Sequence, residues 1–219
     1  MVLTFALTVS LLLQTAGIAL GAPRQETEKK PYVAPFTSMS EPPKLPKVDL
    51  NSCPFEGCQF GKWAATATVI VYSTWESTRK PIVILAKGDE VTALTGVNIV
   101  LQPGKGVFDR DVPLCAARKG DTAYMYQDCG EGAVDMWVHS RFIKCAELEF
   151  SWKRGYGCQT NCDGRWLSLG TSEWWAQIRL KDGTTGWVLV AGNFDGVDAL
   201  AYLWPPQRRL FLVRLHKSS

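Results

Sequence analysis

The segment Ser172-Glu-Trp-Trp-Ala-Gln-Ile-Arg-Leu-Lys-Asp-Gly-Thr-Thr-Gly-Trp-Val188 is the most informative stretch of this chain. It predicts two short strands joined by a turn at Asp182-Gly183, because glycine accepts the positive φ that tight hairpins require. A pair of tryptophans opens the first strand, and Gly-Trp-Val opens the second. The segment therefore predicts a β-hairpin.

The order of side chains along the first strand separates its two faces, because successive residues of a strand point in opposite directions. One face is wholly apolar and should lie in the interior: Trp174, Ala176, Ile178 and Leu180. The other face carries Trp175 together with Gln177, Arg179 and Lys181. We therefore expect Trp175 to lie on the outer face, where it could stack on a ligand; alternatively, it covers the edge of the domain or packs against a neighbouring unit.

Together, the tryptophan before a strand, the Asp-Gly turn and the Gly-Trp-Val sequence resemble the last hairpin of bacterial SH3-like (SH3b) domains. Two Lys-Gly-Asp turns, at 87–89 and 119–121, resemble the turn that leads into the second strand of such barrels. The resemblance implies a small β-barrel that binds peptides or cell wall and performs no chemistry. Tyr72 and Trp75 fall where SH3-like grooves gather aromatic side chains.

Short β-rich runs recur along the rest of the chain and predict an all-β fold. Turn residues separate these runs, and no long stretch shows the apolar spacing of a helix. The runs are at 67–72, 82–85, 90–94 and 123–126. We expect two divergent SH3-like units, at 53–110 and 111–200, the second with an insertion at 138–172. The alternative is one barrel with a large, disulfide-held insertion.

The N-terminal segment indicates an exported protein. Residues 1–22 are apolar and uncharged, with small side chains at Ala19 and Gly21, which is typical of a signal peptide. An uncleaved membrane anchor is the alternative for this segment. Residues 23–52 are rich in proline and polar residues and predict a disordered linker. Residues 201–219 form a basic and apolar C-terminal extension that adds an edge strand or ends as a tail.

The chain has seven cysteines, which in a secreted or periplasmic (cell-envelope) protein indicates disulfides with one thiol left over. Short separations favour the pairs Cys53–Cys58 and Cys158–Cys162. The other candidates are Cys115, Cys129 and Cys145, whose pairing stays open. A competing interpretation is a zinc site that uses Cys158 and Cys162 with two further thiolates. Export favours oxidation, so no metal is predicted.

The residues needed for catalysis are sparse, and we expect neither an enzyme nor a cofactor. A Cys129/His139 pair could form a nucleophilic dyad, but its thiol is expected in a disulfide. The acidic residues of two loops are better explained as turn formers than as glycosidase or calcium residues: Asp128, Glu131 and Asp135 in one, Asp195 and Asp198 in the other. Lysine and arginine are spread thinly and the net charge is +3, which disfavours nucleic-acid binding.

Binding through aromatic side chains is therefore the expected function. Nine tryptophans exceed what two small cores require, so some should be exposed. The candidate ligand-binding residues are Trp175, Trp75, Tyr72 and Trp137, although two separate units would keep Trp175 apart from Tyr72 and Trp75. The expected partners are peptidoglycan peptides or a protein. A structural envelope protein and a cell-wall hydrolase are the alternatives.

Overall fold

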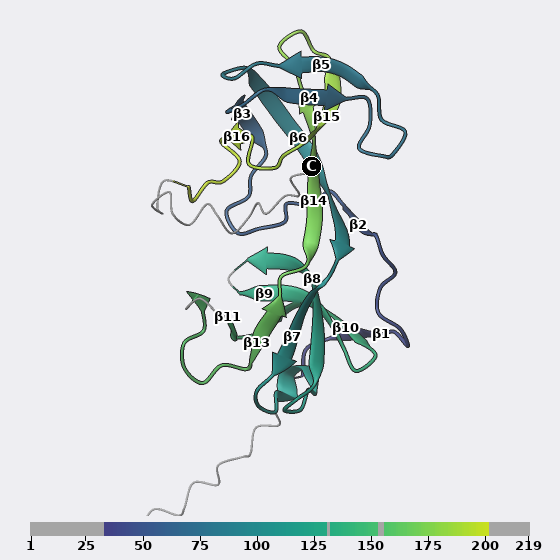
Figure 1. Ribbon diagram of the computed structural model, residues 1–219, viewed down its shortest axis with the longest axis vertical. Helices are drawn as coiled ribbons and strands as arrows, with labels where there is room; N and C mark the ends of the chain where they lie inside the picture. Colours follow the sequence, from purple (N-terminus) through teal and green to yellow (C-terminus); the bar gives the residue numbers. More distant parts are fainter. Residues whose placement is uncertain (1–32, 131, 153–155, 202–219) are drawn as a thin grey trace, which may run out of the picture. The chain divides into compact units, whose positions relative to one another are not determined.

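The computed structural model describes residues 33–130, 132–152 and 156–201 (Figure 1). The expected signal peptide, the first part of the expected linker, Glu131 and residues 202–219 lie outside the described residues. Within the described residues, no helix is long and apolar enough to cross a bilayer.

Nearly all regular structure in the described residues is β-strand, which confirms the expected all-β fold. The strands form two sheets, and every strand pair is antiparallel except β11 with β13. One short 3-10 helix, Pro113–Cys115, interrupts the strands.

We call the first sheet the split sheet, because two segments far apart in the sequence build it. Its order is β16-β3-β6-β14-β15-β4-β5, and β2 also pairs with β6. The strands are β2 (Lys47–Leu50), β3 (Gly61–Ala65), β4 (Val69–Tyr72), β5 (Pro81–Leu85), β6 (Glu90–Gln102), β14 (Thr171–Arg179), β15 (Thr185–Leu189) and β16 (Phe194–Asp195).

We call the second sheet the inserted sheet, because most of it comes from the chain between β6 and β14. Its order is β1-β10-β9-β8-β7-β13-β11-β12. The strands are β1 (Phe36–Ser38), β7 (Gly104–Phe108), β8 (Thr122–Gly130), β9 (Ala133–Val138), β10 (Arg141–Glu147), β11 (Phe150–Trp152), β12 (Tyr156–Gly157) and β13 (Gly164–Ser168).

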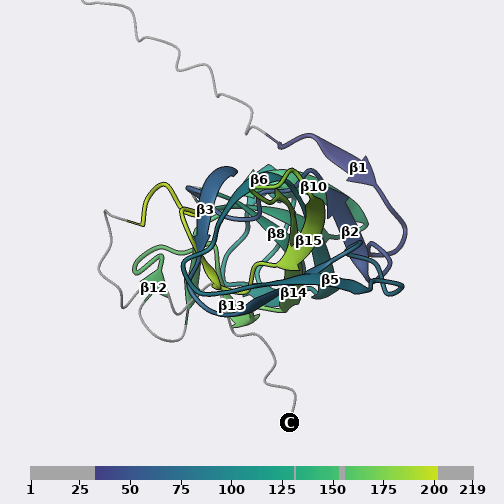
Figure 2. The same ribbon diagram turned by 90° about the horizontal axis from the view of Figure 1, so that it is seen from above.

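The split sheet is strongly curled (Figure 2). Seven of its strands contribute to one hydrophobic core, and a single sheet can surround a core only by bending around it. Trp63, Val71, Ile178 and Val188 are among the most buried side chains of this core, each at most 2% exposed. The curled split sheet therefore has an inner face that is packed and an outer face that is available for other contacts.

The predicted hairpin is present. Strands β14 and β15 pair in antiparallel fashion, and Gly183 adopts a φ of +89° in the turn between them. The side chain of Asp182 accepts a hydrogen bond of 2.9 Å from the backbone N–H of Thr184, which fixes the turn. Trp174 packs against the inner core and Trp175 lies on the opposite side, as alternation predicts.

The hairpin pairs with strands that precede the insertion. Strand β14 pairs with β6, and Trp187 of β15 pairs with Tyr72 of β4. The hairpin therefore joins the strands of the first expected unit, whereas β1 and the strands from β7 to β13 form the inserted sheet. The strand pairing therefore gives one curled sheet whose two segments are separated in the sequence by the inserted sheet.

The described part of the expected linker is not disordered throughout. Strand β2 pairs with residues Val97–Val100 of β6, and β1 pairs with residues 141–143 of β10. Ala34 is buried in the core of the inserted sheet. The physical reason is that β6 is 13 residues long and β3 pairs only with its first part, so the same edge leaves backbone groups for β2 farther along.

Three disulfides join Cys53 to Cys58, Cys129 to Cys145 and Cys158 to Cys162. The two pairs expected from short separations are confirmed. Cys115 is the free thiol; it is fully buried, and this burial raises its pKa. Three disulfides indicate an oxidising, extracytoplasmic environment.

Candidate functional site

Aromatic side chains collect on the outer face of the split sheet. Tyr72 of β4, Trp175 of β14 and Trp187 of β15 all point away from the inner core, because each alternates with a buried core residue along its strand. Trp75 joins them from the loop after β4. We call this group, together with Leu189, the aromatic face.

The members of the aromatic face are in direct contact. Tyr72 and Trp187 are cross-strand partners, and Trp175 is the partner of Leu189. The rings of Tyr72 and Trp175 meet edge to face, with centroids 5.8 Å apart and an angle of 71° between planes. This is a favourable arrangement for two aromatic quadrupoles. The structure thus brings together three of the four residues that the sequence singles out, Tyr72, Trp75 and Trp175.

Arg79 lies above this group. Its guanidinium carbon is 4.8 Å from the ring centroid of Trp175 and 5.7 Å from that of Tyr72. At these distances the cation is attracted to the electron-rich faces of the rings. Arg79 therefore places a positive charge directly on the aromatic face.

The loop that carries Trp75 and Arg79 is held by its own hydrogen bonds. The backbone N–H of Ser73 donates to the carbonyl of Lys80 over 2.9 Å, and the N–H of Lys80 donates to the hydroxyl of Ser73 over 3.1 Å. Within the loop, the N–H of Arg79 donates to the carbonyl of Glu76. These bonds close the loop at its base and keep the side chains of Trp75 and Arg79 beside the sheet.

The expectation that Trp175 is exposed is wrong. Its side chain is 2% exposed, because it packs on Val97 and Ile99 of β6 and is covered by Tyr72, Trp75 and Arg79. Its indole N–H donates to a carboxylate oxygen of Glu173 over 2.9 Å, so the polar atom is also satisfied within the protein. Trp175 is thus the base of the aromatic face, and the half-buried Tyr72, Trp75 and Trp187 are its accessible part.

Exposed aliphatic side chains extend the aromatic face toward the edge of the sheet. Ile70 lies two residues before Tyr72 on the same side of β4, and it is the cross-strand partner of Ile84. Ile70 is 41% exposed and Ile84 is 63% exposed. Strand β5, which carries Ile84, is the last strand of this sheet. The apolar surface therefore ends beside a strand whose outer backbone groups have no neighbouring strand among the described residues.

Trp137 does not belong to this group. It lies on β9 of the inserted sheet, where its ring is 6.0 Å from that of Tyr124. Its indole nitrogen is buried and has no hydrogen-bond partner among the described residues. The sequence places it in the candidate site only because it is a tryptophan, and that is too weak a criterion.

Three members of the site were not identified from the sequence: Trp187, Leu189 and Arg79. For the first two the signal is present, because Gly186-Trp-Val-Leu189 alternates between small or apolar inner residues and large outer ones. Nothing local in the sequence indicates that Arg79 folds back over Trp175.

The other candidate groups have structural roles. Cys129 is in a disulfide, and Nε2 of His139 lies 2.5 Å from a carboxylate oxygen of Asp121, a hydrogen bond that lowers the pKa of Asp121. The side chains of Asp128 and Asp198 accept hydrogen bonds from the backbone N–H groups of Gly130 and Leu200, as turn formers do.

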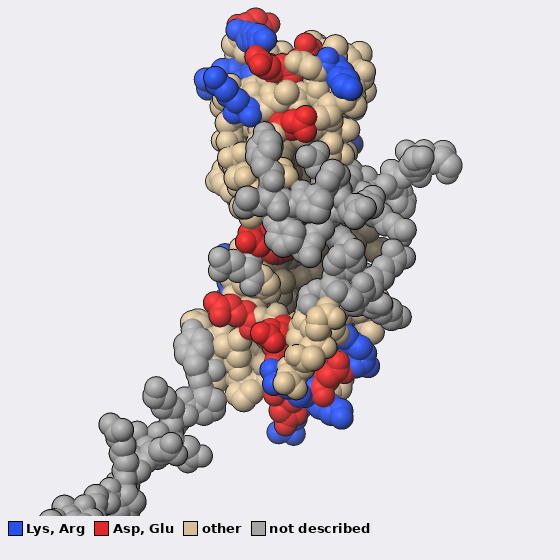
Figure 3. Space-filling view, turned by 90° about the vertical axis from the view of Figure 1, so that its left-hand side faces the viewer, with Lys and Arg blue, Asp and Glu red and all other residues tan. Residues whose placement is uncertain are grey.

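A cavity of about 360 Å³ lies away from the aromatic face, between β3, β6 and the end of β14. Charges of both signs line it, including Lys62, Glu90, Arg179, Lys181 and Asp195. On the molecular face shown in Figure 3, basic and acidic side chains are likewise interspersed.

The aromatic face can bind flat or extended apolar groups, and its arginine can attract anionic ones. Its members come from two strands of the hairpin, one strand before the insertion and one closed loop, so it depends on the complete split sheet. Comparison of the chain with protein-family models, with characterised proteins and with solved structures finds no match.

Proposed function

We propose that this protein is a secreted or cell-envelope binding module of the SH3-like (SH3b) type, which engages peptides of the cell wall through its aromatic face and performs no catalysis. The observation that carries the proposal is the packing of Tyr72, Trp75 and Trp187 around the buried Trp175 on the outer face of the split sheet, with Arg79 stacked on Trp175. In this proposal the closing hairpin of an SH3-like barrel is separated from its first strands by the inserted sheet.

The surface chemistry suits an extended peptide. Half-buried aromatic rings offer flat apolar area and lose little conformational entropy on binding. The exposed side chains of Ile70 and Ile84 continue this area beside the edge strand β5. A peptide that runs along this edge could use both the apolar surface and the backbone groups of β5.

Arg79 favours an anionic peptide. Its guanidinium stacks on Trp175, and one terminal nitrogen, Nη1, donates to the carbonyl of Glu76 over 3.3 Å, so the remaining N–H groups are the ones that would contact a carboxylate. Peptidoglycan stem peptides carry carboxylates and small apolar side chains, so they combine the two features that the aromatic face recognises. This is why stem peptides are proposed before other peptides.

A purely structural role is the second candidate, and the burial of Trp175 favours it. A tryptophan that is 2% exposed and covered by an arginine stabilises the outer face without any ligand. In that case Tyr72, Trp75 and Arg79 close the fold, and any partner binds elsewhere.

The test is retention of the oxidised protein on purified peptidoglycan, with variants at the accessible part of the face. Trp75→Ala and Arg79→Gln remove one ring and one charge without touching the inner core. Trp137→Ala and Arg165→Gln are matched controls, because both lie in the inserted sheet and outside the aromatic face. Circular dichroism of each variant verifies its fold.

We expect the wild type and both controls to be retained, and both face variants to lose at least tenfold in affinity. Retention that depends on Trp137 instead would place the binding surface on the inserted sheet and contradict the proposal. If the wild type is not retained, the cell wall is removed as the partner, and a structural role or a protein partner takes its place.

A further inference from the structure

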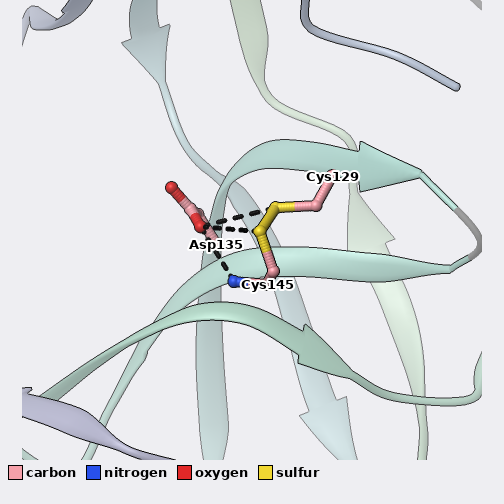
Figure 4. A group of neighbouring side chains, drawn as sticks. All are labelled: Cys129, Asp135 and Cys145. Carbon is pink, nitrogen blue, oxygen red and sulfur yellow. Dashed lines mark hydrogen bonds between the residues drawn. A yellow bond between two sulfur atoms is a disulfide. The ribbon is translucent and has the colours of Figure 1, made fainter.

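A buried carboxylate faces the Cys129–Cys145 disulfide (Figure 4). Asp135 is 7% exposed, and its Oδ1 atom lies 3.5 Å from the sulfur of Cys129 and 3.8 Å from that of Cys145. The same oxygen accepts a hydrogen bond of 2.9 Å from the backbone N–H of Cys145. Disulfide sulfurs have no proton to donate, so the proximity of the carboxylate to both sulfurs needs another explanation.

Irregular strand pairing places these three residues together. Asp135 lies on β9, and the two cysteines lie on its neighbours β8 and β10. The pairing with β9 shifts register between Asp128 and Gly130 on one side and between Ile143 and Ala146 on the other. Two strands separated by a third are normally about 9.5 Å apart, yet the Cα atoms of the cysteines are 5.5 Å apart. The bulges thus direct both side chains over Asp135.

The distances from the carboxylate to the sulfurs are those of a tetrahedral metal site. With Zn–S near 2.3 Å and Zn–O near 2.0 Å, tetrahedral angles put the sulfur and oxygen ligands about 3.5 Å apart. The two sulfurs of such a site are about 3.8 Å apart, so each would move by less than about 1 Å from its position in a disulfide. The hydrogen bond from Cys145 would orient the carboxylate, as outer contacts do in zinc sites.

We propose that Cys129, Cys145 and Asp135 bind one zinc ion when the Cys129–Cys145 bond is reduced. A cavity of about 710 Å³ reaches both cysteines and gives the ion a path and room for a water as fourth ligand. Glu147 and Glu149 line this cavity and attract a cation, whereas Arg110 in the same cavity is paired with Asp163 over 2.6 Å. The disulfide and the zinc site are therefore alternative states of one pair of cysteines.

A phosphine can convert the disulfide state into the zinc-binding state. A phosphine breaks the S–S bond and is oxidised to the phosphine oxide, with water supplying the oxygen and the two protons of the new thiols. Zinc then replaces both thiol protons, which pass to solvent, and an oxygen of the Asp135 side chain is the third protein ligand. The site gains two thiolates and one carboxylate around a doubly charged ion.

The test titrates the full chain with Co²⁺, which absorbs strongly when thiolates bind it tetrahedrally, and then with Zn²⁺ as competitor. We expect no thiolate–cobalt absorption for the oxidised protein and one equivalent for the phosphine-reduced protein, displaced by one equivalent of Zn²⁺. Cys158→Ser/Cys162→Ser is the matched control and should bind as the wild type does. Cys129→Ser should abolish the signal, and Asp135→Asn should weaken binding at least tenfold.

A second measurement, protection of the cysteines from alkylation, distinguishes zinc bound at the folded site from zinc bound by the thiols of an unfolded chain. Zinc should protect Cys129 and Cys145 of the reduced protein from alkylation, as located by mass spectrometry of peptides, and should leave Cys158 and Cys162 reactive. Cobalt binding that persists in Cys129→Ser, or that equals the wild type in Asp135→Asn with native circular dichroism, overturns the proposal. Failure of the reduced wild-type protein to bind cobalt would also overturn the proposal.

Discussion

Replacing Trp175 by alanine tests directly whether this residue is a packed base or an exposed contact. An aromatic side chain removes about 150–250 Å² from water when it is buried. At about 25 cal/mol per Å² this area corresponds to roughly 4–6 kcal/mol, and tryptophan-to-alanine changes in cores cost about 3–5 kcal/mol. Because Trp175 is 2% exposed and also contacts Arg79 and Tyr72, we expect Trp175→Ala to lower the free energy of unfolding by about 4 kcal/mol.

The assay is urea unfolding of the oxidised protein, followed by far-UV circular dichroism so that loss of a tryptophan does not affect the signal. Arg179→Ala is the control, since Arg179 lies on the same strand and face but is exposed, and it should change stability by no more than about 0.5 kcal/mol. A loss of less than about 1 kcal/mol for Trp175→Ala would show that the Trp175 ring is not packed, as expected of an exposed ligand contact.

Three further predictions concern the fold around the site. Replacing both Cys129 and Cys145 by alanine should lower the free energy of unfolding in urea by about 3 kcal/mol, and the same change at Cys158 and Cys162 by about 2 kcal/mol. The first disulfide closes the longer loop, because the sequence separations are 16 and 4. A larger loss for Cys158–Cys162 would contradict this dependence on loop length. Gly186→Ala should lower the free energy of unfolding by about 1–3 kcal/mol. The added Cβ would lie 2.5 Å from Cγ1 of Val71, so β15 would have to move away from β4. An unchanged urea midpoint would show that the strands adjust without this cost. Burial raises the pKa of Tyr126 to about 12, so its contribution to stability is complete below about pH 10 and is lost as the pH rises through 12. Ultraviolet titration of tyrosinate should place the ionisation of Tyr126 at about pH 12. Tyr126→Phe should remove this part of the stability loss at alkaline pH.

The sequence predicts what depends on neighbours along the chain. The turn at Asp182-Gly183 and the opposite faces of Trp174 and Trp175 follow from glycine's positive φ and from the two-residue period of a strand. The Cys53–Cys58 and Cys158–Cys162 pairs follow from short loops. Each of these features needs only a few consecutive residues, which is why they could be predicted.

Features that depend on distant contacts could not be predicted in this way. The burial of Trp175 requires Arg79, which is almost a hundred positions earlier, to fold over it. The Cys129–Cys145 pair depends on bulges in the strands on both sides of β9, and no spacing in the sequence reveals them. The strands within the proline-rich segment form because unpaired edges of β6 and β10 are available, and those edges exist only in the folded sheets.

We propose that Tyr72, Trp75, Trp187 and Arg79 form a binding surface. Its most direct test follows the indole N–H signals of the tryptophans by NMR while soluble peptidoglycan stem peptides are added. We predict that the signals of Trp75 and Trp187 and the guanidinium signal of Arg79 shift in a saturable manner. The signals of Trp137 and of Trp166, which lies on β13 of the inserted sheet, should stay in place. Shifts confined to Trp137 and Trp166, or no shift at all, would contradict the claim.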